Sequence, residues 1–491
     1  MGIPYYFYYL TKKYNNIIIN ELPKNINIFA IDFNGIIHTE AINETNEDKL
    51  IKNLWNKIIE YDDLYKPNKL LICVDGVAPL AKIIQQRKRR YLTFYKNKID
   101  KIDNKWDTNA ISPGTEFMNK LNNYIKHENS KYIYTGSDEE GEGEHKIFNL
   151  IKEESDKEPI IINGLDADLI ILSLISGKSN IYLMRENNKH NNIIYVNIDN
   201  LKKALITELK SNWNIENSNE NDLIESYCTM CSILGNDFIP HLLNLDIQTG
   251  GLDKLINITG NSIKQYGLLV ENNKINQLTL GDIFNQIAET EDNDIITHIN
   301  KDIERKVRDF TLESQEYGIK NKDSVIYDIY SNNKKWRYYY YKKIFDLNIT
   351  NDSALISNAS NNYIKGIYWT YNYYKKMDLD YLWYYPYNYP PTAKDISNYI
   401  KVNRIKEIEN NKLILNPEFQ LLLILPINSI NLIDNSLKKY MTDIKYGMTY
   451  LYPKEYKIQT LFKTHLWECC PVLPIINIDK IIKINNSLYS N

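Results

Sequence analysis

The chain has 491 residues, of which 43% are hydrophobic and 25% are charged, and its formal net charge is −3. These proportions are ordinary for a globular protein of two or three domains. No segment approaches the roughly 18 uninterrupted apolar residues of a membrane span, and the start of the chain does not have the order of a secretory signal. Five cysteines do not indicate a disulfide framework. The composition argues against a membrane protein, a secreted disulfide-rich protein and, because of the negative charge, a general nucleic-acid coat.

Residues 1 to about 245 alternate apolar segments with amphipathic ones, which predicts an α/β fold on a parallel sheet. The strand candidates are INIFAIDF, KLLICVDG, KYIYTGS and PIIINGLD. Three of them finish at an aspartate: Asp32, Asp75 and Asp166. Because parallel sheets bind ligands at the carboxyl ends of their strands, we expect these acids at one functional edge.

Acidic residues also stand at the predicted starts of helices. Asp168 follows Asp166 in GLDADLIILSLI, Glu142 and Glu144 lie in EEGEGEHKIF, and Asp237 lies in SILGNDFIPHLL. Any one of these acids could be an ordinary helix cap. Two carboxylates ~5 Å apart at an effective dielectric of ~20 repel by about 3 kcal/mol, so the convergence of all seven would demand cations.

Carboxylate oxygens favour Mg²⁺ or Mn²⁺ over Zn²⁺. Two such ions would suit phosphoryl transfer, by activating water and stabilising the leaving oxygen. The zinc alternative rests on Cys228 and Cys231, a single CxxC motif. Their spacing on a predicted helix favours core residues instead.

A basic helix is predicted after Pro79, in VDGVAPLAKIIQQRKRRYLTFYK. Lys82, Gln86, Arg89 and Arg90 share one face of it over ~12 Å. These side chains suit phosphate oxygens, although a solvated helix face is an equal alternative. Their closeness in sequence to Asp75 favours a phosphate pocket beside the metal site.

With these motifs, the chain resembles the Xrn/Rat family of 5′→3′ exoribonucleases. The resemblance also includes MGIPYYFYYL, IDFNGIIH, KKWRYYYYKKIF, YIKGIYWTYNYY, LWYYPYNYPP, NPEFQLLLILP and HLWECCPVLPIINIDK, which occur in the order typical of the family. It reaches almost to the last residue, so we expect a compact member that consists of the catalytic core.

The resemblance implies a PIN/FEN-like parallel-sheet nuclease domain in residues 1–250 with two Mg²⁺ or Mn²⁺ ions. It implies a variable helical connection in 251–330 and a largely helical, aromatic-rich region in 331–491 that completes the pocket. The family's metal ligands match Asp32, Asp75, Glu142, Glu144, Asp166, Asp168 and Asp237. Its 5′-phosphate pocket matches Lys82, Gln86, Arg89 and Arg90. Its base-stacking histidine matches His38, and the opposing tryptophan matches Trp383 or Trp369.

The expected activity is processive digestion of single-stranded RNA with a 5′-monophosphate to nucleoside 5′-monophosphates, in mRNA decay. We expect a monomer in the reducing cytoplasm, and a viral protein in the host cytoplasm is an open alternative. DNA as a further substrate is also left open. The two other functional hypotheses are a structure-specific DNA flap nuclease and a catalytically inactive RNA-binding scaffold. The flap nuclease would need a PGIG-like hairpin after GNDF, and the scaffold would have lost acids that are all present here.

Overall fold

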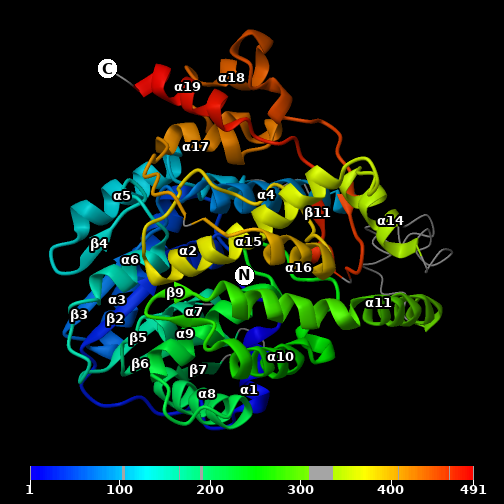
Figure 1. The fold of residues 1–491 in the computed structure, drawn as a ribbon. Coiled ribbons are helices and arrows are strands. Elements are labelled where there is room, and N and C mark those ends of the chain that lie inside the picture. The colour runs from blue at the N-terminus through cyan, green and yellow to red at the C-terminus, as the bar shows by residue number, and fades with distance from the viewer. Residues whose placement is uncertain are drawn as a thin grey trace.

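The computed structural model describes residues 2–101, 106–164, 166–187, 192–308, 335–406, 408–463 and 465–489. Its centre is a seven-stranded sheet of order β1-β7-β6-β5-β2-β3-β4 (Figure 1). The strands are β1 (Ile18–Ile19), β2 (Ile28–Asp32), β3 (Lys69–Cys73), β4 (Ile133–Thr135), β5 (Ile160–Asn163), β6 (Ile181–Asn187) and β7 (Asn192–Asn197). Strands β2 to β6 pair in parallel, whereas β7 pairs antiparallel with β6 and β1. The predicted parallel α/β sheet is confirmed, and the antiparallel edge is an addition to it.

Strand β2 has the apolar sequence of a strand that is buried on both faces. Ile28 and Ala30 face one core cluster, and Phe29 and Ile31 face another. This follows from the two-residue period of a strand, which sends successive side chains to opposite faces. The helices that contribute to the second cluster are α2 (Phe33–Glu40), α3 (Glu47–Tyr65) and α5 (Glu116–Glu128). The first cluster includes residues of α1 (Tyr6–Lys13), α6 (Gly143–Leu150), α7 (Asp168–Ile175), α8 (Ile198–Trp213) and α9 (Glu220–Cys231).

The described middle of the chain is largely helical. It comprises α10 (Gly251–Tyr266), a hairpin of β8 (Val270–Glu271) and β9 (Lys274–Ile275), and α11 (Gln277–Arg308). The rest of the predicted connection, residues 309–330, lies outside the described residues. None of the described helices is long and apolar enough to span a membrane.

The last third of the chain packs on the sheet region in two places. Helices α15 (Ser353–Lys375) and α16 (Ala393–Val402) contribute side chains to the same core cluster as α6 and α7. Helix α17 (Pro417–Ile424) contacts α4 (Leu80–Asp100), and α17, α18 (Lys438–Thr442) and α19 (Ile478–Tyr489) lie together beyond α4 in Figure 1. Helix α14 (Trp336–Tyr340) and the antiparallel pair β10 (Ile458–Gln459) and β11 (Cys470–Pro471) also belong to this part of the chain. The shared core shows that the aromatic-rich region is packed on the sheet region.

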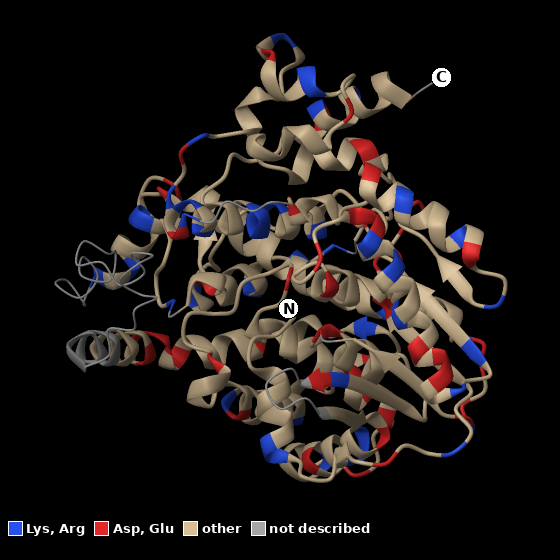
Figure 2. Ribbon diagram, turned by 180° about the vertical axis from the view of Figure 1, so that it is seen from behind, with Lys and Arg blue, Asp and Glu red and all other residues tan. Residues whose placement is uncertain are grey.

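Cys228 and Cys231 both lie on α9 and are buried in the first core cluster. They are core residues, as their spacing indicated. Basic and acidic residues are interspersed along the ribbon (Figure 2). A charged functional site among the described residues is therefore a small cluster of side chains and not a whole face of one charge.

Candidate active site

Three predicted acids lie where β2, β3 and β5 end. Asp32 is the last residue of β2, Asp75 follows β3 by two residues, and Asp168 is the first residue of α7, which follows β5. Strand β2 lies between β3 and β5, so the chain leaves β2 toward one side of the sheet and later returns on the other. Such a switch point is where open α/β sheets bind ligands.

Helix α6 brings two more acids to this edge. Its first residue is Gly143, whose backbone N–H donates to Asp75 Oδ1 at 2.7 Å. A Cβ atom at this glycine would lie 2.9 Å from Asp32 Oδ1, so only glycine allows so close an approach. Glu142 and Glu144 flank the glycine and are 4% and 5% exposed. The helix therefore begins inside the carboxylate cluster.

Lys82 lies among these acids. Its Nζ is 2.6 Å from Glu142 Oε2 and 2.9 Å from Asp237 Oδ2. The other oxygen of Asp237 accepts a hydrogen bond of 3.1 Å from the backbone N–H of Gly2. Gly2 has a φ of +56°, and a Cβ atom there would overlap the Asp168 carboxylate. The start of the chain is thus packed between Asp168 and Asp237.

The pKa values of the cluster follow from burial and mutual repulsion. Burial, and then the charge of Asp75, raises the pKa of Asp32 to about 7. Burial likewise raises the pKa of Glu142 to about 7, although Lys82 opposes this effect. Burial and repulsion by Asp168 raise the pKa of Glu144. At Asp237 burial acts in the same direction, but the adjacent Lys82 ammonium holds the pKa well below its usual range.

The donor set fits divalent cations. All the donors are carboxylate oxygens, and bound cations would relieve the burial cost and the repulsion that raise the pKa values of Asp32, Glu142 and Glu144. Within the described ranges, however, no three His, Cys, Asp or Glu side chains are close enough together to hold an ion. Lys82 supplies the neutralising charge between Glu142 and Asp237 instead.

The seventh predicted ligand, Asp166, is half-buried two residues before Asp168. Its role as a ligand stays a prediction. The other six acids are connected by the hydrogen bonds, salt bridges and charge interactions given above.

Two tyrosines of α15 reach the cluster and were not predicted. The Tyr373 hydroxyl donates to Glu142 Oε1, and the Tyr374 hydroxyl donates to Asp168 Oδ1 at 2.9 Å. The chain has 40 tyrosines, so a tyrosine pair carries little signal in the sequence. Through these bonds the aromatic-rich region forms part of the acidic site.

The predicted phosphate-binding face of α4 divides into two groups. Lys82 belongs to the acids, whereas Arg89 is exposed two helical turns further along the chain. Arg90 donates to Asn109 Oδ1 at 2.7 Å and to Ser112 Oγ at 2.8 Å, so two of its nitrogens are engaged. Gln86 is half-buried between the two groups.

His38 lies beside the arginines. Burial, followed by the charges of Arg89 and Arg90, lowers the pKa of His38 to about 4. The imidazole is therefore neutral at neutral pH, and it presents an uncharged ring next to a cationic group. Its proximity to the arginines was not evident from their separation in the sequence.

The two candidate tryptophans differ in burial. Trp369 is fully buried, stacks on Tyr373 with 5.1 Å between ring centroids, and donates to the carbonyl of Asp380. A base could not reach this ring without a rearrangement, so Trp369 is a core residue. Trp383 is half-buried and packs against Trp369 at 5.2 Å, which leaves it as the candidate for stacking.

Models of known protein families match most of the chain. A family model described as XRN 5'-3' exonuclease N-terminus matches residues 1–187, and one described as Xrn1 helical domain matches residues 217–330 and 301–491. The 5'-3' exoribonuclease 2 homolog of Drosophila melanogaster is 24% identical over 644 aligned residues, which cover 98% of this chain and 70% of that protein. The 5'-3' exoribonuclease 1 of Homo sapiens is 25% identical over 587 residues, covering 98% of this chain and 34% of the relative.

Solved structures give weaker likenesses. A bacteriophage T5 D15 flap endonuclease complex with DNA and metal ions has a TM-score of 0.30 at 10% sequence identity. The match covers 53% of this chain and 79% of the endonuclease chain. The catalytic core of Rad2 with a DNA substrate has a TM-score of 0.33 at 12% sequence identity. The match covers 83% of this chain and 97% of the Rad2 chain. Scores this low support no functional inference, whereas the two family matches span most of the chain. The chain belongs to the Xrn family of 5′→3′ exoribonucleases.

Proposed function

We propose that the protein digests single-stranded RNA with a 5′-monophosphate, one nucleotide at a time from the 5′ end, and so acts in RNA decay. The observation that carries this proposal is the arrangement along α4. Lys82 lies within the buried carboxylates. Arg89 lies seven residues further along α4, about 10 Å away along the helix axis, and His38 of α2 lies beside Arg89. Groups for a cleaved phosphate and for a terminal phosphate are thus about one or two nucleotides apart.

The carboxylates of Asp32, Asp75, Glu142, Glu144, Asp168 and Asp237 would hold Mg²⁺ or Mn²⁺, together with Asp166. When bound, such ions supply Lewis-acid stabilisation of the charge that develops on the phosphate. Lys82 would place a positive charge against the same phosphate. Tyr373 and Tyr374 hold Glu142 and Asp168 in fixed orientations, which favours a preorganised site.

The end of the substrate would be recognised by Arg89, Arg90 and Gln86. Guanidinium groups bind phosphate oxygens through charge-assisted hydrogen bonds, and a pocket formed by one helix face suits one phosphate better than three. The neutral ring of His38 and the indole of Trp383 would stack on the leading bases, at roughly 1–3 kcal/mol for each base. Each cut creates a new 5′-monophosphate, so the product of one step is the ligand of the next.

A comparison of RNA ends tests this function. Wild-type protein and Arg89→Ala would be given Mg²⁺ and RNAs of one sequence that carry a 5′-monophosphate, a 5′-triphosphate or a 5′-hydroxyl. We expect the wild type to prefer the monophosphate. Loss of Arg89 should lower the preference for monophosphate over hydroxyl at least about tenfold, because a charge-assisted hydrogen bond contributes roughly 1.5–3 kcal/mol.

Lys98→Ala is the matched control, since Lys98 is an exposed cation near the end of the same helix. It should leave the preference unchanged. Equal rates of the wild-type protein on triphosphate and monophosphate RNA would contradict the pocket. So would an equal loss on all three ends in Arg89→Ala, because that result describes a general basic surface.

A further inference from the structure

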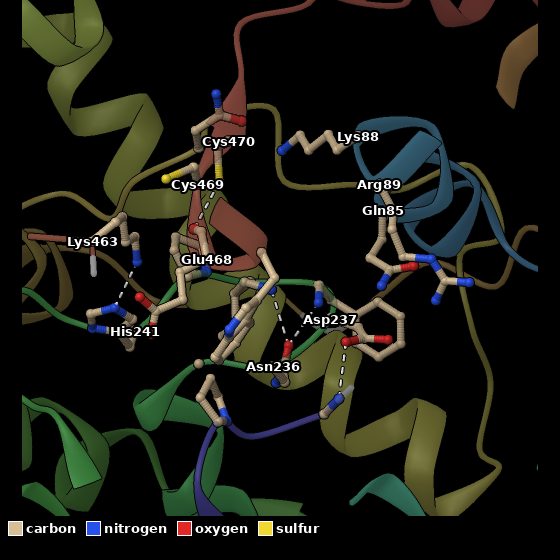
Figure 3. A pocket seen from close by; sticks show the side chains of 18 of the residues that line it. Gln85, Lys88, Arg89, Asn236, Asp237, His241, Lys463, Glu468, Cys469 and Cys470 are labelled. Atoms are coloured by element: carbon tan, nitrogen blue, oxygen red, sulfur yellow. Dashed lines mark hydrogen bonds between the residues drawn. The ribbon is translucent and has the colours of Figure 1, made fainter. Parts of the chain in front are cut away.

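A cavity of about 450 Å³ opens beside the carboxylates (Figure 3). Gly2 and Asp237 line its inner end, where they are part of the acidic cluster. Figure 3 shows Gln85 and Arg89 of α4 on one side and Lys463 and Glu468 on the other. Trp467, which is 50% exposed, is also a lining residue, so the cavity leads from the cluster to the surface.

Two rings lie beside the exposed Trp467, which lines the cavity. The ring of Trp467 is nearly parallel to that of His465, with centroids 6.1 Å apart and planes at 9°. Tyr5, from the segment that precedes α1, lies on another side of Trp467 at 6.0 Å. A tryptophan that is held in place and half exposed presents an apolar face to anything that enters or leaves the cavity.

The walls are more basic than acidic. The lining includes Lys88, Arg89, Lys96 and Lys463, against Asp237, Asp246 and Glu468. Asp237 is already neutralised by Lys82, so the lining as a whole carries an excess of positive charge. Aromatic platforms within a cationic groove are how proteins bind single-stranded nucleic acids without regard to sequence.

Lys463 is a positioned charge in this wall. Its Nζ is 3.0 Å from His241 Nε2, and His241 Nδ1 is 2.9 Å from the carbonyl oxygen of Leu242. The carbonyl can only accept, so Nδ1 carries the proton and Nε2 accepts from the lysine. Burial, and then the charge of Lys463, lowers the pKa of His241 to about 3, which keeps the imidazole neutral and the lysine in place.

We propose that this cavity carries the stretch of RNA that follows the cleaved bond, and that Trp467 is a stacking platform at its mouth. The inference rests on the proposed function. Of the described residues, those that line the cavity do not include His38 and Arg90, so the cavity differs from the predicted 5′-phosphate pocket and meets it at Arg89. A passage for the released mononucleotide is the alternative. An aromatic platform at the mouth favours the strand, because it would retain a product that must leave after every cut.

Binding of RNAs of increasing length tests the proposal without catalysis. Fluorescence anisotropy in EDTA would give Kd values for 5′-monophosphate oligouridylates of 2 to 12 nucleotides. We expect Trp467→Ala to weaken binding of the 12-nucleotide RNA roughly 5- to 150-fold and to leave the dinucleotide unchanged, because a short RNA does not reach the mouth. Trp467→Phe should restore most of the affinity. Tyr266→Ala, which removes an exposed aromatic at the end of α10, should have no effect at any length.

An equal loss at every length, or no loss, would overturn the proposal. Unchanged RNA affinity together with altered inhibition by uridine 5′-monophosphate would also overturn it, since the cavity would then be a product passage. Failure of the wild-type protein to digest RNA would count against the proposed function instead. The length dependence of binding is measured in EDTA without cleavage, so its outcome does not depend on whether the protein digests RNA.

Discussion

Asp168 shows most clearly the electrostatic cost of the buried acidic cluster. It is 1% exposed at the first turn of α7 and accepts a hydrogen bond from Tyr374. Burial, and next the charge of Asp237, raises its pKa. A carboxylate in such a place costs stability unless positive charge compensates it. A charged carboxylate at this position therefore lowers the stability of the fold, which points to a role other than folding.

The substitution Asp168→Asn tests the role of this carboxylate in RNA cleavage separately from its effect on stability. It keeps an oxygen that can accept from Tyr374 but removes the charge. We expect RNA cleavage to fall at least about 100-fold, because metal binding and charge stabilisation are lost. In EDTA the free energy of unfolding should rise by about 1–3 kcal/mol, because repulsion is relieved. Single-turnover assays and urea denaturation measure the two effects.

Asp48→Asn is the control for this substitution. Asp48 also lies in the first turn of a helix, α3, but it is exposed. Its replacement should lower the free energy of unfolding by no more than the usual helix-dipole contribution, about 0.3–1 kcal/mol, and should leave RNA cleavage unchanged. Full activity in Asp168→Asn would remove Asp168 from the site.

Single site residues could be predicted from the sequence where they stand at recognisable positions in strands and helices. Acids at the ends of parallel strands were predictable because strand order alone brings them together. Lys82 was expected with the phosphate-binding group, yet it lies with the acids, because its place two residues into α4 points it at Glu142 and Asp237. Trp369 and Trp383 could not be distinguished until the burial of each was known.

Among the helices, α11 and α16 are joined by a buried acid. Glu291 on α11 is 3% exposed, and its carboxylate accepts from the backbone N–H groups of Ala393 at 2.6 Å and Lys394 at 3.2 Å. These groups form the first turn of α16, which supplies unpaired N–H donors. Burial raises the pKa of Glu291 to about 7, and repulsion by Asp395 adds to that effect while the two hydrogen bonds oppose it.

This contact predicts a pH-dependent stability. The pKa of Glu291 is higher in the folded state than its ordinary value of 4.5, so its contribution is full below pH ~4.5 and is lost as the pH rises through about 7. The stability of the wild type relative to Glu291→Gln should therefore fall by up to about 3 kcal/mol over that range. Denaturation curves between pH 4.5 and 8 would show it. Glu289→Gln, an exposed site on the same helix, should give a curve parallel to the wild type. Parallel curves for Glu291→Gln as well would contradict the account.

Strands and helices could be predicted from the sequence where a short run of neighbouring residues carries the pattern. The four strand candidates correspond to β2, β3, β4 and β5, because each is a short apolar run that ends at a turn or an acid. Helix α4 was predicted to begin after Pro79, and it begins at Leu80. The antiparallel edge formed by β6, β7 and β1 was not predicted, since β1 is a pair of residues that becomes a strand only by pairing with β7.

Over the whole molecule, the site is assembled from distant parts of the chain. Gly2 donates to Asp237 across 235 positions, and Tyr373 donates to Glu142 across 231. The aromatic-rich region and the sheet region share one core cluster, which fixes α15 over the acids. Contacts of this range depend on tertiary packing and leave no pattern in the local sequence. This is why the two tyrosines were missed, although the general role of their region in completing the pocket was expected from the family resemblance.

We expect the assembled site to degrade RNA only from a free 5′ end. A direct test uses one RNA in two forms, linear with a 5′-monophosphate and an internal label, or ligated into a circle. With Mg²⁺, we expect the linear RNA to be converted to nucleoside 5′-monophosphates without intermediate fragments, whereas the circle should stay intact. Cleavage of the circle, or shortening of the linear RNA from its 3′ end, would contradict it.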